Sequence, residues 1–288
     1  MQRAALGIIR EHDIILSVRG ALNHISLSQR TDAVDQITDA GTSVRSGFCS
    51  SIFQNPSLVT VFAKVGNNVR ILSNRSMLEM VTDGVRLALD EHHIAPKACS
   101  VDEILTGGRT DLPVVLHTEL LCGQLLRLTV AACDTKTEAS VHFATFNRGH
   151  SAFDWVMRIL SDLKNALPPK LILGIGFGGS DEVALILAKE SLTDSADLSV
   201  AERGNPTHPR NVLRQELRER LNDCLIGSGS TFSNSSITEV KIAGHYAPDH
   251  DYVVALVIQS ARTRFVTVTL DGSGPVYPHF PAAAVNPR

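Results

Sequence analysis

Cysteine is the residue type in this chain whose chemistry depends most on spacing, because thiolates bind a metal or form a disulfide only when they converge. The sequence of 288 residues contains five cysteines, at positions 49, 99, 122, 133 and 224. None of them forms a CxxC pair, and their spacing suggests no framework of disulfides. This usage is typical of a reducing compartment and predicts a cytoplasmic protein. Cys122, Cys133 and Cys224 lie in apolar runs, where we expect the thiol to behave as a small hydrophobic group, although the spacing alone leaves a metal site open.

A glycine-rich segment is the second pattern that could do chemistry. Residues 173–179 read LGIGFGG and are followed by Ser180. In a turn between a strand and a helix, the backbone N–H groups of such a segment could bind an anion at the helix N-terminus. A dinucleotide fingerprint would also need an alternating series of strands and helices, which the flanking sequence does not show. We therefore favour a tight strand-to-helix connection packed closely against its neighbours.

The composition excludes several classes of function. The formal net charge is −3, with 43% hydrophobic and 20% charged residues, which is ordinary for a globular chain and unlike a disordered one. No run approaches the ~18 consecutive apolar residues of a membrane span, and Glu11 and Asp13 interrupt any signal-peptide core. The clustered Lys and Arg of a nucleic-acid-binding surface are missing. We therefore expect neither a membrane nor a nucleic acid as a partner.

Hydrophobic periodicity predicts an α+β fold with mixed sheets flanked by helices. Helices are expected in the first forty residues and over residues 76–91, 151–165, 181–192 and 212–225. Strands are expected over residues 58–65, 171–175, 237–243 and 252–258, and a hairpin over 114–120 and 125–133. Because no repeat or linker interrupts the chain, we expect one domain over residues 1–275, followed by a loosely held Pro/Ala-rich tail over 276–288.

Five of these segments, taken in order, resemble the α-subunit, or N-terminal catalytic domain, of class I fumarases and L-tartrate dehydratases. They are residues 61–70 (VFAKVGNNVR), 116–119 (LHTE), 173–179 (LGIGFGG), 188–192 (AKESL) and 269–275 (TLDGSGP). The resemblance covers most of the chain and implies the α-type hydro-lyase fold. These hydro-lyases use a four-iron cluster, in which three thiolates hold three irons and the fourth iron acts on the substrate as a Lewis acid. Their active site forms with a β-type domain, and they pair through the α-type domain. The resemblance thus implies a homodimer and a separate β-type subunit as partners.

The three cysteines that hold the cluster in the family align with Phe53, Leu167 and Ser260 of this chain. Phe and Leu carry no lone pair to offer a metal, and a Ser hydroxyl is a hard, normally protonated ligand. Cys49 lies four residues before Phe53 and is the one cysteine near a ligand position. The resemblance therefore implies degenerate ligand positions, with no metal and no cluster as cofactor.

Several polar positions of the family's active site have counterparts here. Gln54 matches the family's Gln, and Asn55 replaces a carboxylate and cannot ionise. Lys97 lies near a substrate-binding Arg and keeps its positive charge without its bidentate geometry, whereas Arg264 is retained. The resemblance implies that these four residues bind a small carboxylic acid.

Two further positions concern the chemistry itself. His250 falls on the family's active-site His and is the candidate catalytic residue, with a surface histidine as the alternative. The family's glycine-rich substrate loop corresponds to residues 134–139 (DTKTEA), whose side chains prevent a close approach of the backbone to a ligand.

These replacements favour a hydro-lyase homologue that acts as a non-catalytic partner or binds a small carboxylic acid. The alternative is a lyase or hydratase that works without a cluster on a dicarboxylate or hydroxy acid. In that case His250 would be the acid–base group, and Lys97 and Arg264 would hold the carboxylates. A third hypothesis is a subunit that scaffolds an assembly.

Overall fold

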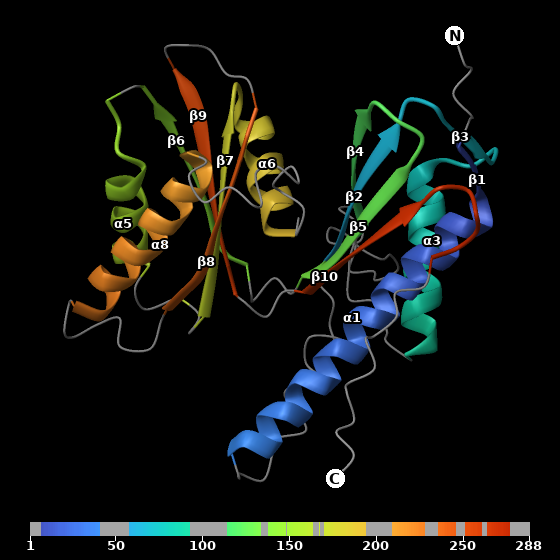
Figure 1. Cartoon of the computed structure of the whole chain (residues 1–288), viewed down its shortest axis with the longest axis horizontal. Coiled ribbons are helices and arrows are strands. Elements are labelled where there is room, and N and C mark those ends of the chain that lie inside the picture. Colours follow the sequence, from blue (N-terminus) through green and yellow to red (C-terminus); the bar gives the residue numbers. More distant parts are fainter. Residues whose placement is uncertain are drawn as a thin grey trace, which may run out of the picture. The chain divides into compact units, whose positions relative to one another are not determined.

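In the computed structural model the chain has an α+β fold with mixed sheets, as expected, and divides into two compact units (Figure 1). The structure describes residues 7–40, 58–92, 114–133, 138–147, 149–163, 167, 170–193, 209–227, 236–245, 251–260 and 264–276. Unit 1 consists of Met1–Asp134 and Arg264–Arg288, and unit 2 of Thr135–Thr263. Since two compact units can belong to one domain, the single domain over residues 1–275 stays a prediction.

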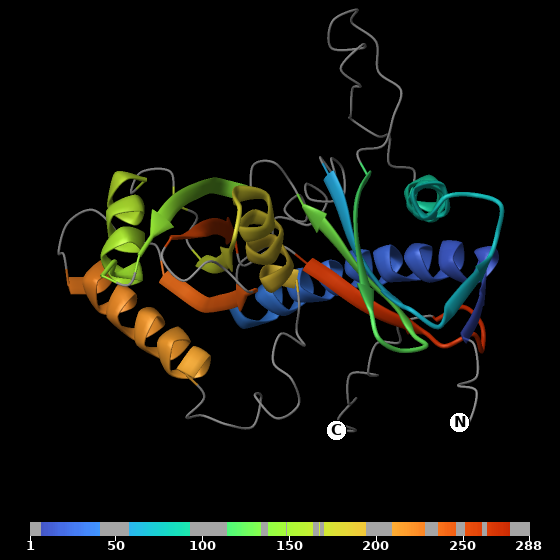
Figure 2. The same cartoon turned by 90° about the horizontal axis from the view of Figure 1, so that it is seen from above.

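Unit 1 contains a four-stranded mixed sheet in the order β10-β5-β2-β4 and a two-stranded parallel sheet of β1 and β3. Its elements are β1 (Gly7–Arg10), α1 (Glu11–Ala40), β2 (Leu58–Gly66), β3 (Val69–Leu72), α3 (Met77–Glu91), β4 (Val114–Leu121), β5 (Leu126–Cys133) and β10 (Arg264–Leu270). The helices α1 and α3 lie beside the four-stranded sheet (Figure 2). Apolar side chains at alternate positions of β2, such as Val59 and Val61, face them and form the core with Val18 and Val85. The chain stays attached to this unit as far as Val276, whose N–H donates to Ser17 Oγ at 2.8 Å.

The start of the helix α3 is determined by its local sequence. Ser76 is its N-cap and accepts a hydrogen bond from the N–H of Glu79, whose carboxylate accepts one in return from the N–H of Ser76. This capping box satisfies donors that a helix start would otherwise leave without partners. The same bonds to Ser76 hold the pKa of Glu79 below its ordinary value. The helix expected over residues 76–91 is therefore confirmed, with its first residue serving as the cap.

The hairpin expected over residues 114–133 is wrong. The strand β2 lies between β4 and β5, pairing in parallel with β4 and antiparallel with β5. The turn after β2 meets the loop between them, where Asn67 N donates to Leu121 O and Asn68 N to Gly123 O. A Cβ on Gly66 would come within 2.5 Å of Gly123 O, so this approach needs glycine. Most of β2 is buried, so it occupies the centre of the sheet and separates two strands that are neighbours in sequence.

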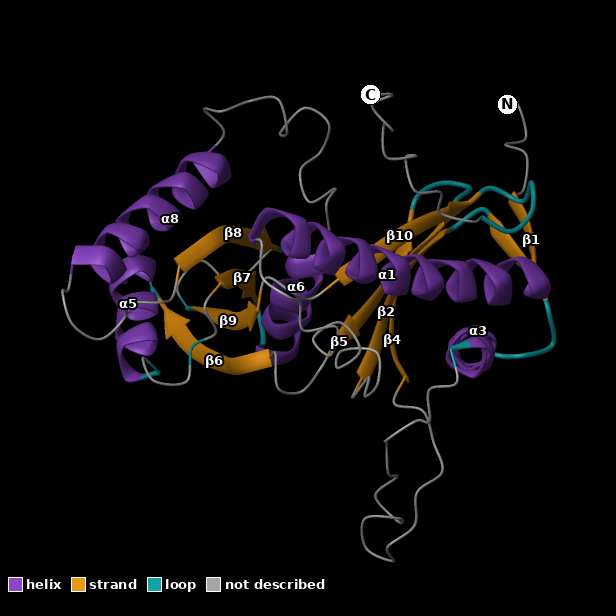
Figure 3. Ribbon diagram, turned by 90° about the horizontal axis from the view of Figure 1, so that it is seen from below, coloured by secondary structure: helices purple, strands orange, loops and turns teal. Residues whose placement is uncertain are grey.

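Unit 2 contains a four-stranded mixed sheet in the order β6-β9-β7-β8. Its elements are β6 (Glu138–Phe146), α5 (Ala152–Asp162), β7 (Lys170–Gly178), α6 (Asp181–Thr193), α8 (Pro209–Gly227), β8 (Ser236–Gly244) and β9 (Tyr252–Ser260). The helices α5 and α8 cover one face of the sheet and α6 covers the other (Figure 3). Alternate residues of β9 contribute to the two cores, with Leu256 under α5 and α8 and Ala255 under α6.

The glycine-rich segment lies within β7 and is not a turn. Gly174, Gly176 and Gly178 occupy alternate positions and therefore share one face of the strand, the face that α6 covers. A Cβ on Gly174 would lie 2.5 Å from Ala188 O, and one on Gly178 would lie 2.8 Å from Ala184 N. The close packing that we favoured is confirmed, whereas the turn is wrong, because the glycines bring a whole helix against a strand.

Candidate functional site

Two of the three positions that the resemblance aligns with cluster cysteines lie at one end of the unit 2 sheet. Ser260 is the last residue of β9 and pairs with Leu171, the second residue of β7. Leu167 precedes that strand, and its half-buried side chain packs against the core cluster that includes Leu160 and Leu171. The pairing of β7 with β9 thus brings positions 167 and 260 to the same sheet end.

A matching set of positions lies at one end of the unit 1 sheet. Arg264 begins β10 and pairs with Ala132, while Cys133 ends β5 and pairs with Leu58, the first residue of β2. Gln54 and Asn55 precede Leu58 by four and three residues. The register therefore places the start of β10, the end of β5 and the start of β2 together.

The chain also passes between the units at these ends. It leaves unit 1 after Asp134 and returns to it at Arg264. Asp134 begins the range 134–139, which the resemblance aligns with the substrate loop, and Ser260 lies four residues before Arg264. Within each unit, candidate positions that are far apart in sequence thus lie at one end of the sheet.

The remaining candidate residues lie outside the described part of the chain. These are Phe53, Gln54, Asn55, Lys97 and His250, and the roles expected for them stay predictions. Ser260 and Arg264 are placed by their backbone pairing alone.

Two cysteines differ from what the apolar runs predict. Cys122 and Cys224 are free and exposed, so they are not small hydrophobic groups of a core. Cys122 lies in the loop after β4, and Cys224 lies on the solvent side of α8, positions that a local run of apolar residues does not reveal. Among the described residues, no three His, Cys, Asp or Glu side chains come together in a way that could hold a metal ion.

The face of the unit 1 sheet opposite α1 and α3 carries several polar side chains, which the sequence did not lead us to expect. Lys64 Nζ lies 3.4 Å from Glu119 Oε2, and the hydroxyls of Thr129 and Thr267 are hydrogen-bonded at 2.9 Å. In β10, polar residues at alternate positions, Thr267 and Thr269, were a usable signal. These side chains lie side by side because of the strand register. That register depends on pairing between strands that are distant in sequence, so a local sequence pattern does not predict it.

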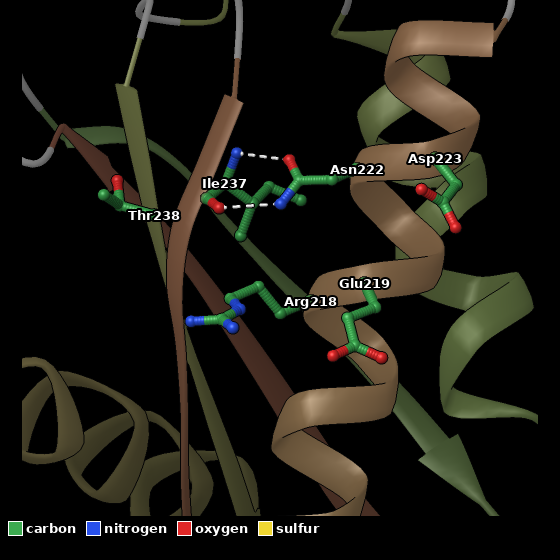
Figure 4. A pocket seen from close by; sticks show the side chains of 6 residues that line it. All are labelled: Arg218, Glu219, Asn222, Asp223, Ile237 and Thr238. Atoms are coloured by element: carbon green, nitrogen blue, oxygen red, sulfur yellow. Dashed lines mark hydrogen bonds between the residues drawn. The ribbon is translucent and has the colours of Figure 1, made fainter.

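A surface hollow lies between α8 and β8 in unit 2, lined by Arg218, Glu219, Asn222, Asp223, Ile237 and Thr238 (Figure 4). Ile237 pairs with Leu171, the partner of Ser260, so the hollow lies at the same sheet end as position 260. Two of its three charged side chains are acidic, and Asn222 is bonded to the backbone of Ile237. This lining does not favour a carboxylate ligand.

Two half-buried histidines, His24 on α1 and His142 on β6, make stability depend on pH. Burial lowers the pKa of both, and Asp162 partly opposes this effect at His142. A lowered pKa in the folded state means that the unfolded chain binds more protons, so stability is lost as the pH falls below the ordinary value of about 6.5. Urea unfolding at one protein concentration should therefore show lower stability at pH 5.5 than at pH 7.5. The double variant H24Q/H142Q should lose part of that difference, and an unchanged difference would contradict this explanation.

A comparison with known families identifies the family of this chain. The chain matches the profile of the family described as fumarate hydratase (fumerase) over residues 45–269. This range covers most of the chain and includes every candidate position from Phe53 to Arg264. The chain belongs to the fumarate hydratase family. A comparison with curated proteins finds no match. No described helix is long and apolar enough to cross a membrane.

Proposed function

We propose that this member of the fumarate hydratase family binds a small carboxylic acid without an iron–sulfur cluster, as a non-catalytic partner in an assembly. The observation that carries the proposal is the pair of positions at the end of the unit 2 sheet. Leu167 and Ser260 stand where cluster cysteines are expected, and neither supplies a thiolate. In a cluster-binding protein of this fold, that sheet end would have to carry sulfur ligands.

The surroundings of Leu167 support this interpretation. Its side chain packs with the apolar groups of the unit 2 core, so an aliphatic residue fits its place there. An aliphatic carbon has no lone pair for iron, and the hydroxyl of Ser260 is a poor substitute for a soft thiolate. The residues at these positions therefore do not fit the cluster, and we derive no chemistry from it.

Carboxylate binding is supported by the place of Arg264. A guanidinium can bind a carboxylate through two parallel hydrogen bonds, which makes Arg the preferred residue for this group. Arg264 begins β10 beside the end of β5 and the start of β2, the strand that follows Gln54 and Asn55. We propose that these three residues, together with Lys97, hold the acid. A homodimer, a separate β-type subunit and a cytoplasmic location complete the proposal.

The test of the cluster proposal is the iron and acid-labile sulfide content after anaerobic reconstitution. We expect a colourless protein with far less than one iron per chain. The variant F53C/L167C/S260C restores a thiol at each ligand position and serves as the positive control, which should take up iron under the same conditions. A brown wild-type protein with broad visible absorption would overturn the proposal.

Ligand binding is tested by calorimetry with fumarate, malate, tartrate and mesaconate. Arg264→Gln should weaken binding by about tenfold or more, because a charged hydrogen bond contributes about 1.5–3 kcal/mol. Arg218→Gln, in the hollow beside α8, is the matched control and should bind as the wild type does. Equal affinity of Arg264→Gln and wild type would exclude this site. Turnover that His250→Ala abolishes would instead favour the lyase that works without a cluster.

A further inference from the structure

The polar face of the unit 1 sheet carries two cations on neighbouring strands. Lys64 of β2 pairs directly with Arg127 of β5 in the antiparallel register. Both lie on the face away from α1 and α3, because their sequence neighbours Ala63 and Leu128 belong to the core on the other face. Residues directly opposite each other in an antiparallel pair have Cβ atoms about 4.5–5.5 Å apart. The strand register thus holds two positive groups side by side.

The same register continues across the sheet and completes a row of polar residues, one from each strand. Glu119 of β4 pairs with Lys64, and Thr269 of β10 pairs with Arg127. The strands lie in the order β4, β2, β5 and β10 (Figure 1). We call these four residues, Glu119, Lys64, Arg127 and Thr269, the cation row. Its two end residues are exposed and its two cations are half-buried, so the row is open to solvent.

One carboxylate does not balance the two cations of the row. Lys64 Nζ lies 3.4 Å from Glu119 Oε2, whereas Arg127 makes no hydrogen bond or ion pair with the described residues. The acidic residue that follows β10 is Asp271, and its carboxylate accepts a hydrogen bond from Ser273 N within its own turn. Like charges directly opposite each other destabilise a strand pair, and a partly buried charge is costly without a counter-ion. The cation row is therefore short of one negative charge.

The adjacent row of the same face has no such deficit. The hydroxyls of Thr129 and Thr267 are hydrogen-bonded to each other at 2.9 Å. The rings of Phe62 and His117 are stacked, with their centroids 5.1 Å apart. Because these side chains satisfy one another in pairs, this row needs no ligand. The deficit is specific to the cation row.

We propose that the cation row binds a phosphate group between Lys64 and Arg127. A guanidinium offers two parallel N–H donors to an oxyanion, an ammonium adds a point charge, and the hydroxyl of Thr269 adds a further donor. These groups come from three adjacent strands, spaced about 4.8 Å apart, so they reach a tetrahedral group from several directions. A planar carboxylate offers only two oxygens, which Arg127 alone would satisfy. The arrangement therefore favours phosphate over carboxylate.

This site is separate from the acid site proposed above. Arg264 begins β10, and Thr269 lies five residues further along the same strand. Five residues of a strand span about 17 Å, so a phosphate in the cation row does not touch the start of β10. The two sites can therefore be lost independently of each other.

Glu119 competes with the phosphate for Lys64. Its side chain is 52% exposed, and an ion pair as exposed as this one contributes little, so Lys64 can leave the carboxylate for a phosphate at small cost. Glu119→Gln removes the competing charge and should tighten phosphate binding several-fold. Asp90→Asn, at an exposed carboxylate of α3, changes the net charge equally and should leave the affinity unchanged. Weaker binding by Glu119→Gln would contradict the site.

The first test is calorimetric titration of the full chain, at low ionic strength, with inorganic phosphate and in parallel with glycerol phosphate. Saturable binding of either probe is expected, and the comparison tells free phosphate from the phosphate of an organic ester. Arg127→Gln should weaken binding tenfold or more, because the charged hydrogen bonds are lost. Arg70→Gln, at an exposed arginine of β3, is the matched control and should bind as the wild type does.

Circular dichroism shows whether each variant is folded. If the wild type binds neither probe, or if folded Arg127→Gln binds phosphate as tightly as the wild type does, the proposal is wrong. Fumarate serves as a dianion without a tetrahedral group, and any affinity for it should not change in Arg127→Gln. Failure of fumarate binding would count against the acid site alone, so the two proposals are tested separately.

The second test separates a ligand-binding role of Arg127 from a structural one by thermal unfolding. Without phosphate, Arg127→Gln should be at least as stable as the wild type, because the substitution removes the repulsion from Lys64. With phosphate, the midpoint of the wild type should rise by more than that of the variant, since a ligand that binds only the folded state stabilises it. The general stabilising effect of phosphate is common to both proteins and cancels in this comparison. A variant that is less stable without phosphate, or equal shifts in both proteins, would overturn the proposal.

Discussion

Gly176→Ala should lower the free energy of unfolding of unit 2 by about 3 kcal/mol, the upper part of the range for an overpacked core. Gly176 lies in the middle of β7, under α6, and a Cβ there would overlap Ala184 O and come within 2.5 Å of Ala188 N. Both atoms belong to the helix backbone, so no rotation of a side chain can relieve the overlap. The helix itself would have to move away from the sheet, and the small core between α6 and β9 would open.

Trp155 can report the unfolding of unit 2, and Gly149 offers a matched control for the substitution of Gly176. Trp155 is the only Trp of the sequence and is buried in the unit 2 core, so its fluorescence follows the unfolding of that unit in urea. Gly149→Ala is the matched control, because the added methyl would meet only Asn147 Oδ1, at 3.5 Å. It should change stability by less than about 0.5 kcal/mol. Similar effects of both substitutions would mean that α6 does not require glycine beneath it.

Local patterns in the sequence predicted most elements but not their partners. The helix α6, expected over residues 181–192 and found over Asp181–Thr193, is set by a continuous run of helix-forming residues. The strand β2 is set by a β-branched run that ends at Gly66. Its insertion between β4 and β5 depends instead on pairing between distant strands, which a local pattern does not show. The same limit explains why β6 and β10, edge strands with mixed polar and apolar residues, were not expected.

For the candidate site, the structure places only the backbone of some of the positions that the motifs single out, and their roles stay predictions. The motifs assigned positions 167, 260 and 264 to a site, and the strand register gathers Leu167 with Ser260 at one sheet end. It also places Arg264 beside the strand that follows Gln54 and Asn55. The glycine pattern of residues 173–179 did not identify its own role. The same spacing occurs in a turn that binds an anion and in a strand that packs closely against a helix. What distinguishes the two is the helix above β7, and its position depends on the tertiary structure.

Asn222→Ala should lower the free energy of unfolding of unit 2 by about 2 kcal/mol. The carboxamide of Asn222 accepts from Ile237 N at 2.8 Å and donates to Ile237 O at 2.9 Å, so it acts as one more strand residue along the edge of β8. Ile237 is buried, and removal of the amide leaves both backbone groups without a partner, at about 1–3 kcal/mol for such a loss. Asn222→Asp keeps the acceptor and loses the donor, and its effect should be intermediate.

Asp223→Ala is the control for this series, since Asp223 is the exposed neighbour on the same helix and its loss should change stability by less than about 0.5 kcal/mol. Amide exchange of Ile237 gives a second measurement that packing alone would not move. In Asn222→Ala this amide should exchange faster, while amides in the centre of β7 keep their protection. Equal stability of the Asn222 and Asp223 variants, with unchanged exchange at Ile237, would show that α8 closes the edge by packing alone.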